Sequence, residues 1–366
     1  MVWGGAERQV LDLAVGLERR GHRVHLTVNK DVTGFQEQFS AGPFSTRVLR
    51  RQSGLDVRIL RDLISTVRDF KPDVVLAVMY NATLWGRLAA ILTGCPVVVA
   101  EHGTQSKWPA KVVLTDRLLA PFTSRVIACA DAQIPSIGRM GHDVSRCEVI
   151  TNGVNVDAFY RDPEGGRLFR QAHGIPEGCF VVGLVAAHRP MKRHDRFIRV
   201  IEDLRHRRDD IWGCMIGGGA LLEQTARLVE ASQAADRLVL VGPVDDMRAA
   251  YCATDVVALT SAWGESYPLA FLEAQACGVP VVGMDFGGVR ETFVDGETGL
   301  LVPQGDSLCL ADILEQLAAE PQRWRRLSDH CRPWAMTHSL EPMIARYESV
   351  LLSVVAAGRR RSGRDS

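Results

Sequence analysis

Glu265 and Glu273, separated by seven residues, are the side chains whose type and spacing most suggest a shared ligand. Glu265 falls in a loop after an apolar strand, and Glu273 lies about one turn into a helix predicted to begin near Pro268. Proline suits a first helical turn, where its missing N–H is not needed. Both carboxylates can therefore face one cleft and accept hydrogen bonds from hydroxyl groups. A lone pair of glutamates is more often explained by the preference of acids for a helix amino end.

The amino end of this helix is itself a candidate binding site for a phosphate. Its first N–H groups, those of Leu269 and Ala270, have no acceptor inside the helix and would point at a ligand. The helix macrodipole adds attraction for negative charge at this end. Carboxylates beside a phosphate site would suit a ligand that carries both phosphate and sugar hydroxyls.

A basic run, His188–Asp195, follows the first predicted strand of the second half of the chain. A departing phosphate accumulates negative charge, so fixed Arg and Lys groups that meet it in the transition state stabilise it most. Lys192 and Arg189 are the candidates for this role. Such a run taken alone is more often a solvated helix start, because most exposed charge clusters are only surface.

The eighteen residues that begin at Glu265 resemble the E-x7-E signature of glycosyltransferase family 4. They read ESYPLAFLEAQACGVPVV, and the similarity continues through residues 287–291 and 295–302. The resemblance implies a retaining enzyme that moves a sugar from a UDP- or GDP-linked donor to a glycan, lipid-linked or small-molecule acceptor. It also implies that no metal and no cofactor is needed, since the nucleotide sugar is a substrate.

The resemblance assigns roles to the residues of this motif. Glu265 would hold hydroxyls of the donor sugar and count as catalytic, while Glu273 would accept hydrogen bonds from the donor ribose. Neither needs to be a nucleophile. The other donor-binding residues of the motif would be Ser266, Tyr267, Leu269 and Ala270.

Lys192 matches the family pattern, whereas Arg189 departs from it. Residues 192–195 fit the end of the family's G-R-L-x-x-x-K-[GR]-x-D pattern, which makes Lys192 a catalytic and donor-binding candidate. Ala187 stands where the family commonly has arginine, so Arg189 is the nearest substitute.

Further candidates lie in the first half of the chain. Gly4 and Gly5, in a G-G-A-E-R element that resembles the family's, open the first predicted helix and permit close backbone approach to the donor. His102 follows an apolar strand, and in a doubly wound fold such a position lines the crevice. The matching family position contacts the donor sugar near its reacting carbon, so His102 is a catalytic candidate.

Apolar runs bounded by Gly, Pro and Asp alternate with amphipathic stretches along the whole chain, which indicates two doubly wound α/β sheets. The predicted strands are Arg23–Val28, Asp73–Val78, Pro96–Ala100, Arg125–Ala130, Cys147–Ile150, Phe180–Ala186, Cys214–Gly217, Leu238–Val241, Val256–Thr260 and Pro280–Gly283. Two facing Rossmann-like domains of this kind form the GT-B fold that the resemblance implies.

The predicted domains are an acceptor-side domain at 1–158, a nucleotide-sugar domain at 159–335, and a returning helix with a basic, irregular tail at 336–366. A doubly wound half has its central first strand before the glycine-rich turn. The chain begins three residues before Gly4, so the first strand of the N-terminal domain is expected to be missing.

The composition is typical of a soluble globular protein, with 46% hydrophobic residues, 23% charged residues and a formal net charge of zero. That balance predicts no nucleic-acid partner. The nine cysteines are odd in number and form no C-x-x-C pair, so we expect reduced core thiols. Without a recognisable signal sequence, membrane span or metal-ligand cluster, the predictions are a cytoplasmic location and no metal.

Other functions stay open at this point. The amphipathic stretch Lys111–Arg125 suggests peripheral contact with the inner membrane face, although an ordinary domain helix is the commoner explanation. A nucleotide-sugar epimerase or a phosphorylase shares the two-domain architecture, and an inactive sugar-nucleotide-binding protein would keep the same residues. Gly217–Gly219 alone would suggest a dehydrogenase, but the spacing of the dinucleotide fingerprint is lacking.

Overall fold

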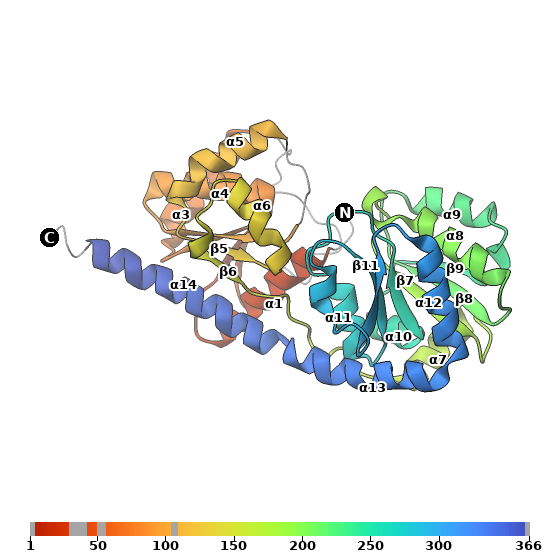
Figure 1. The fold of residues 1–366 in the computed structure, drawn as a ribbon. Coiled ribbons are helices and arrows are strands. Elements are labelled where there is room, and N and C mark those ends of the chain that lie inside the picture. Colours follow the sequence, from red (N-terminus) through yellow and green to blue (C-terminus); the bar gives the residue numbers. More distant parts are fainter. Residues whose placement is uncertain (1–3, 29–41, 50–55, 104–108, 363–366) are drawn as a thin grey trace. The chain divides into compact units, whose positions relative to one another are not determined.

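The computed structural model describes residues 4–28, 42–49, 56–103 and 109–362, which form two compact units (Figure 1). Unit 1 contains the described residues up to Asn152 together with those from Leu340 onward, and unit 2 contains Gly153–Ser339. The sequence-based boundaries, after residues 158 and 335, lie a few residues from these points.

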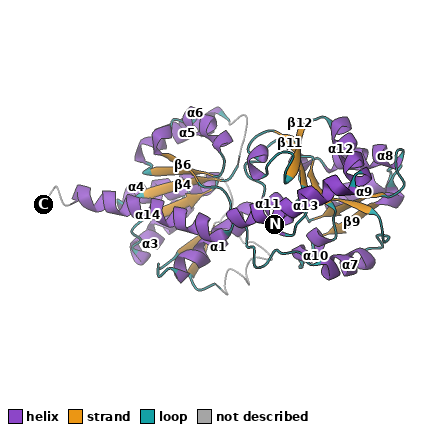
Figure 2. Cartoon of the chain, turned by 60° about the horizontal axis from the view of Figure 1, so that its bottom comes forward, coloured by secondary structure: helices purple, strands orange, loops and turns teal. Residues whose placement is uncertain are grey.

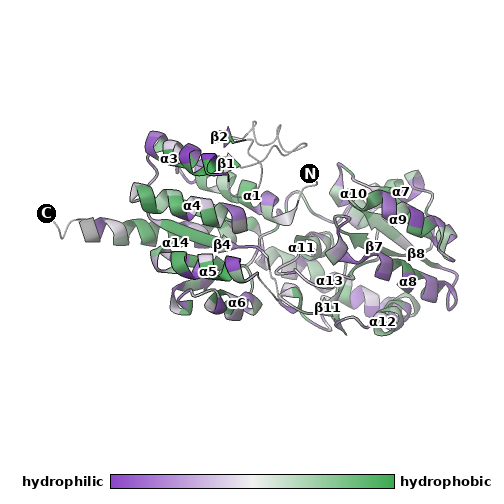
Figure 3. Ribbon diagram, turned by 90° about the horizontal axis from the view of Figure 1, so that it is seen from above, coloured by the Kyte–Doolittle hydropathy of each residue, from purple (hydrophilic) through white to green (hydrophobic). Residues whose placement is uncertain are grey.

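Unit 2 is built on a six-stranded parallel sheet with the order β12-β11-β10-β7-β8-β9. Its strands are β7 Phe180–Val185, β8 Ile211–Ile216, β9 Leu238–Gly242, β10 Val256–Leu259, β11 Val281–Asp285 and β12 Gly299–Pro303. Strands that are buried on both faces are apolar along their whole length, as the green of β7 and β8 in Figure 3 illustrates. The five strands predicted for this half are all present within a few residues of their expected bounds.

The strand order shows where this sheet would bind a ligand. Along the chain, β7, β8 and β9 extend the sheet in one direction, and β10, β11 and β12 extend it from the other side of β7. This is the order 3-2-1-4-5-6 of the dinucleotide-binding folds. The direction of growth reverses between β7 and β10, and ligands of such sheets bind at the carboxyl ends of the strands at that switch point.

Helices cover the two faces of the unit 2 sheet (Figure 2). One group consists of α8, which packs against α9 and α12, and another of α11, which packs against α10 and α13. The helices are α7 Pro163–Ala172, α8 His194–Arg205, α9 Leu222–Glu230, α10 Met247–Cys252, α11 Leu269–Ala276, α12 Ser307–Ala319 and α13 Pro321–Thr337. Because α11 lies among β11, α10 and α13, nearly all of its side chains are buried.

Unit 1 contains a four-stranded parallel sheet with the order β3-β4-β5-β6 and a separate parallel pair, β1-β2. The strands are β1 His25–Val28, β2 Ser45–Val48, β3 Val75–Val78, β4 Val97–Glu101, β5 Arg125–Ala128 and β6 Cys147–Val149. Five of these were predicted, and β2 was missed because only one of its four residues is apolar. The missing first strand stays a prediction.

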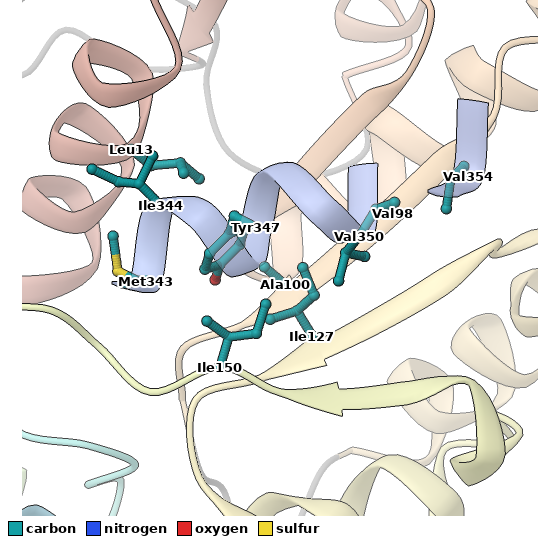
Figure 4. Close-up of a cluster of buried hydrophobic side chains, with 10 residues drawn as sticks. All are labelled: Leu13, Val98, Ala100, Ile127, Ile150, Met343, Ile344, Tyr347, Val350 and Val354. Carbon is teal, nitrogen blue, oxygen red and sulfur yellow. The ribbon is translucent and has the colours of Figure 1, made fainter. Parts of the chain in front are cut away.

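The helices of unit 1 are α1 Gly5–Arg19, α3 Arg58–Phe70, α4 Tyr80–Thr93, α5 Ala110–Leu119, α6 Ile134–Arg139 and α14 Leu340–Ser362. The last of these joins the core of the unit although it is remote in sequence. Side chains of α14 pack against α1, β4, β5 and the segment after β6 (Figure 4). The cluster comprises Leu13, Val98, Ala100, Ile127, Ile150, Met343, Ile344, Tyr347, Val350 and Val354. Each large apolar side chain buried in this way contributes about 1.5–3 kcal/mol to folding.

The prediction of an irregular basic tail is wrong for residues 358–362, because α14 continues through Ser362. Arginine is a good helix former, and positive charge is favourable near a helix carboxyl end. Arg359 also pairs with Asp73, at 3.2 Å. Among the described residues, no helix combines the length and the apolar character that crossing a membrane requires.

A buried ionic cluster joins three elements of unit 1. Arg87 on α4 pairs with Asp116 on α5, and His142 contacts the other carboxylate oxygen at 3.0 Å. Burial alone would raise the pKa of Asp116, but its hydrogen bonds with His142 and Arg87 hold it below the ordinary value. The Arg87 guanidinium also donates to the Thr83 carbonyl at 2.8 Å. The cluster therefore links α4, α5 and the segment after α6.

Candidate active site

Lys192 and Glu265 meet at the switch point of the unit 2 sheet. Lys192 ends a short 3-10 helix after β7, and Glu265 lies in the loop after β10. The lysine Nζ is 2.5 Å from Glu265 Oε1, and the same oxygen accepts a hydrogen bond from Ser261 Oγ at 2.5 Å. The Lys192 side chain is 19% exposed and that of Glu265 is 7% exposed. Lys192 is therefore partly exposed to solvent, and the Glu265 carboxylate holds it at the switch point, where a ligand is expected to bind.

Hydrogen bonds fasten the loops that carry this pair to one another. Thr260 Oγ1 donates to the carbonyls of Lys192 and Arg193, at 3.0 and 3.1 Å. The Ala262 N–H donates to the Met191 carbonyl at 2.8 Å. Thr260 received no role from the sequence, although its place at the carboxyl end of a predicted strand could have indicated one. These bonds fix the lysine before any ligand arrives.

Glu273 is also held from a neighbouring element. It lies in the second turn of α11 and is 6% exposed. The Tyr251 hydroxyl, on α10, donates to Glu273 Oε2 at 2.7 Å. The sequence did not reveal Tyr251, because it lies 22 residues away on another helix and no local spacing connects the two. A buried carboxylate oriented by a tyrosine is suited to accept a hydroxyl group's hydrogen bond.

The amino end of α11 presents backbone rather than side chains. Pro268 has extended backbone with ψ 115°, and the helix begins at Leu269. The N–H groups of Leu269 and Ala270 therefore occupy the first two helical positions, which have no acceptor within a helix. Tyr267 is 2% exposed as a whole residue and its ring stacks on His338, so its side chain is closed to a ligand.

Arg189 stands apart from the Lys192–Glu265 pair. Its side chain is exposed, and in the described part of the chain no carboxylate forms an ion pair with it. Behind this loop the imidazoles of His188 and His194 stack with their centroids 3.9 Å apart. Burial, with the nearby charges of His188 and Lys192, lowers the pKa of His194 to about 3. The basic run therefore carries three cations, Arg189, Lys192 and Arg193, of which Arg193 pairs with Asp195 at 2.8 Å, while burial lowers the pKa of both histidines.

The glycines after β8 serve packing. Gly219 has a φ of +149°, and a Cβ on it would lie 2.6 Å from the backbone nitrogen of His188. A side chain there would push the turn after β8 away from the turn after β7. Close backbone packing therefore accounts for the glycines at positions 217 and 219, and a bound dinucleotide is not needed to explain them.

In unit 1, the candidates lie where the sequence placed them along the chain. Gly4 caps α1 and Gly5 is its first residue. His102 directly follows β4, and burial lowers its pKa to about 4, so the imidazole is neutral at pH 7. These residues belong to a different unit from Lys192 and Glu265, and their part in donor binding stays a prediction.

Gln133 organises the segment around His102, although the sequence gave it no role. Its Nε2 donates to the carbonyls of Glu101 and Gly103, at 3.2 and 3.1 Å, and its Oε1 accepts the Cys129 N–H at 2.7 Å. A single amide thus links the segments that follow β4 and β5. Burial and the charge of a neighbouring aspartate raise the pKa of Glu101 to about 7.

Comparison with known proteins identifies the family. The family described as Glycosyltransferase Family 4 matches residues 3–158, and the family described as Glycosyl transferases group 1 matches residues 167–333. A GDP-mannose-dependent alpha-(1-6)-phosphatidylinositol monomannoside mannosyltransferase from Mycolicibacterium smegmatis is 31% identical, covering 76% of this chain and 74% of the relative. The chain belongs to glycosyltransferase family 4. A D-inositol 3-phosphate glycosyltransferase from the same organism is 29% identical to this family 4 enzyme, over 71% of this chain and 68% of the relative.

Solved structures agree on the fold of this family 4 glycosyltransferase. HepE from Anabaena, solved in complex with UDP-glucose, matches with a TM-score of 0.86, 21% identity and 96% coverage of each chain. The predicted GT-B fold, with two Rossmann-like domains, is thereby confirmed. The enzyme is a glycosyltransferase that uses a nucleotide-sugar donor, and the comparisons do not favour an epimerase, a phosphorylase or an inactive binding protein.

Proposed function

We propose that this glycosyltransferase binds the diphosphate of its donor at the switch point of unit 2 and transfers the sugar with retention of configuration, without a metal. The observation that carries the proposal is the Lys192–Glu265 contact of 2.5 Å, where loops after β7 and β10 meet. Lys192 and Arg189 would meet the negative charge that builds on the departing diphosphate. The first N–H groups of α11 would bind a phosphate oxygen.

The two glutamates would divide the rest of the donor between them. Glu273, oriented by the Tyr251 hydroxyl, accepts hydrogen bonds from the ribose. Glu265 accepts them from the sugar and holds the ammonium of Lys192 in place while the diphosphate arrives. Because Lys192 and Glu265 are already ordered, little reorganisation is needed in the transition state. His102, Gly4 and Gly5 would complete the donor contacts from unit 1.

Retention of configuration follows if the leaving phosphate also acts as the base. The bond between the anomeric carbon and the phosphate oxygen breaks, and the acceptor oxygen bonds to that carbon on the same face. The acceptor proton passes to the phosphate, so a protein nucleophile is unnecessary. The enzyme then contributes position and charge stabilisation.

The donor is proposed to carry UDP or GDP. One relative is named for GDP-mannose, and one solved neighbour holds UDP-glucose. Melting temperatures measured with UDP-, GDP- and ADP-sugars would identify the nucleotide, because a ligand that binds only the folded state raises the melting temperature. We expect a shift with a UDP- or GDP-sugar that persists in EDTA and is lost in Lys192→Ala. A shift that requires a divalent cation, or that survives in this variant, would contradict the proposal.

We further propose that the acceptor is lipid-linked and that this cytoplasmic enzyme reaches it at the inner membrane face. Leu114 and Leu118 on α5 and Phe122 just beyond it are 61%, 65% and 57% exposed, at a spacing of four residues. Exposed Lys111 and Arg125 flank them. Hydrophobic residues also colour much of α5 in Figure 3. An apolar stripe between cations suits a surface of anionic lipid.

Sedimentation with vesicles of anionic or of neutral lipid tests this contact. We expect binding to anionic vesicles that falls with salt and is lost in Leu118→Glu. A matched control is Leu308→Glu, because Leu308 is equally exposed, at 66%, but lies in unit 2 on α12. Equal sedimentation of both variants with anionic vesicles would exclude α5 as the membrane contact.

A further inference from the structure

Arg196 lies in the first turn of α8, where its side chain is a half-buried cation. Its neighbours Arg193 and Arg199 both pair with Asp195, at 2.8 and 2.7 Å. Of the carboxylates in the described ranges, none forms an ion pair with Arg196. Burial and the nearby charge of Arg193 lower the pKa of Arg196, although an arginine stays charged at neutral pH. A cation that has lost part of its water needs other hydrogen-bond acceptors, so the contacts of Arg196 indicate its role.

The guanidinium of Arg196 contacts the carboxyl ends of two neighbouring strands. Its Nη1 donates to the carbonyl of Thr260, directly after β10, at 3.1 Å, and lies 3.2 Å from the sulfur of Met284 on β11. The N–H of Gly305, which follows β12, contacts the same sulfur at 3.2 Å. A hydrogen bond from a charged donor is about twice as strong as one between neutral groups. Arg196 therefore holds Thr260 in place at this edge of the sheet.

Thr260 in turn constrains the backbone that carries Lys192. Its side chain is fully buried, and its hydroxyl is shared between the carbonyls of Lys192 and Arg193, at 3.0 and 3.1 Å. Arg193 has a φ of +52°, in the left-handed region that is unfavourable for a residue with a side chain. Such a conformation persists only where surrounding contacts hold it. The turn from which Lys192 reaches Glu265 therefore depends on the hydrogen bonds that Thr260 donates.

We propose that Arg196 is a positioning residue for sugar transfer, which acts through Thr260 to fix the turn that carries Lys192. The guanidinium holds the Thr260 carbonyl, and the Thr260 hydroxyl holds the Lys192 carbonyl. The Lys192 ammonium is thereby kept 2.5 Å from Glu265 Oε1, where it would meet the charge that builds on the departing diphosphate. Arg196 acts on the donor only through Lys192, so the inference rests on the proposed function of that lysine.

Steady-state kinetics of Arg196→Met test this role, because methionine keeps an unbranched apolar side chain but donates no hydrogen bond. We expect kcat to fall about tenfold, with a change of less than about threefold in the KM for the donor. Arg196→Lys, which keeps a charged donor, should recover part of the loss. Arg199→Met, at an exposed position of the same helix, is the matched control and should keep the wild-type kcat. A lower free energy of unfolding with an unchanged kcat would mean that Arg196 only stabilises the fold, and would overturn the proposal.

Variants of Thr260 test the same series of contacts, also if Arg196→Met fails to fold. Thr260→Val removes the hydroxyl and keeps the shape of the side chain, so kcat should again fall about tenfold. Thr260→Ser keeps the hydroxyl and should stay within about threefold of the wild type. The double variant of Arg196→Met and Thr260→Val should lose no more than the worse single variant, because both changes release the same turn. Losses that multiply in the double variant would overturn the proposal.

The decisive experiment repeats Arg196→Met in enzyme that already carries Lys192→Ala, with sugar transfer followed in a single turnover. We expect a further loss of less than about twofold, because no ammonium remains to be positioned. A further loss of about tenfold would overturn the proposal, since Arg196 would then act by another route. If Lys192→Ala alone keeps wild-type turnover, the proposed function fails. If Lys192→Ala loses activity and Arg196→Met does not, only the positioning role of Arg196 fails.

Discussion

Unit 1 and unit 2 each bring a basic side chain against a carboxylate, but the two arrangements differ in their access to solvent. In unit 1 the side chains of Arg87, Asp116 and His142 are 1%, 4% and 5% exposed. In unit 2 the carboxylate of Glu265 is similarly buried, while its partner Lys192 is 19% exposed. A cation that is fully buried can only stabilise the fold, whereas a cation that is partly exposed to solvent can also contact a ligand. Variants of the buried Arg87–Asp116 cluster should therefore lower stability, whereas variants of the Lys192–Glu265 pair should lower activity.

The largest expected effect is on the stability of unit 1. Asp116→Ala leaves Arg87 buried without its carboxylate, which should lower the free energy of unfolding by about 3–5 kcal/mol. Urea denaturation of this variant and of Asp143→Ala, whose carboxylate is exposed, measures the difference. If Asp116→Ala unfolds at the wild-type midpoint, the cluster has no structural role and the comparison fails.

The next effect is on turnover in unit 2. Glu265→Ala removes both the sugar contact and the partner of Lys192, so kcat/KM should fall about 100- to 1000-fold, as for other groups that act in a transition state. The free energy of unfolding should change by less than in Asp116→Ala, because Lys192 can reach solvent. Activity within about threefold of the wild type would contradict the role of Glu265. Glu297→Ala, at an exposed turn, is the matched control.

A smaller effect is expected at Tyr251. Tyr251→Phe keeps the ring and removes only the hydroxyl that orients Glu273. Loss of one hydrogen bond to a carboxylate should raise the KM for the donor about tenfold, with a smaller change in kcat. The test is a steady-state titration of the donor at saturating acceptor. A lower kcat with an unchanged KM would mean that Tyr251 does not act through donor binding.

The smallest predicted effect is a dependence of stability on pH that arises in both units. Burial lowers the pKa of His102 to about 4, and burial with the nearby charges of His188 and Lys192 lowers that of His194 to about 3. Between these values and the unfolded pKa of about 6.5, the unfolded chain binds protons that the folded protein does not. The free energy of unfolding therefore falls as pH decreases through this window. Glu101, whose pKa is raised to about 7, acts in the opposite direction.

Urea midpoints at about pH 7 and about pH 5 measure this dependence. His194→Asn and His102→Asn should flatten it by similar amounts, because folded pKa values of about 3 and about 4 leave both imidazoles without a proton between pH 5 and pH 7. The exposed His206, replaced by Asn, is the control. A profile of His194→Asn that matches the wild type would show that this histidine is not neutral in the folded protein.

The parts of the structure that the sequence predicted are those set by local pattern. Continuous apolar runs marked the buried strands, and the spacing of Glu265 and Glu273 marked the motif on α11. Strand β2 has no apolar run, and the helical end of α14 carries arginines that resemble an irregular tail. Tyr251 and Gln133 were missed for another reason. Each acts on a segment that is distant along the chain, so only the folded arrangement brings it to its partner.

At the candidate active site, too, the sequence did not reveal contacts between residues that are distant along the chain. The sequence placed Lys192 and Glu265 in separate roles, one for phosphate and one for sugar hydroxyls. The structure joins them in one ion pair, because the strands before them are neighbours only after the sheet has formed. Arg189 was chosen from its position in the basic run; its side chain is exposed, and its role stays a prediction.

One double variant decides whether the switch point of unit 2 holds the donor diphosphate. Nucleotide affinity and sugar transfer are measured for Lys192→Ala with Glu273→Gln, against Arg227→Ala with Glu297→Gln as a control pair of exposed residues. We predict that the first pair loses at least about 100-fold in kcat/KM with every accepted nucleotide sugar, while the control pair keeps wild-type values. Intact turnover and nucleotide binding in the first pair would show that the donor binds elsewhere.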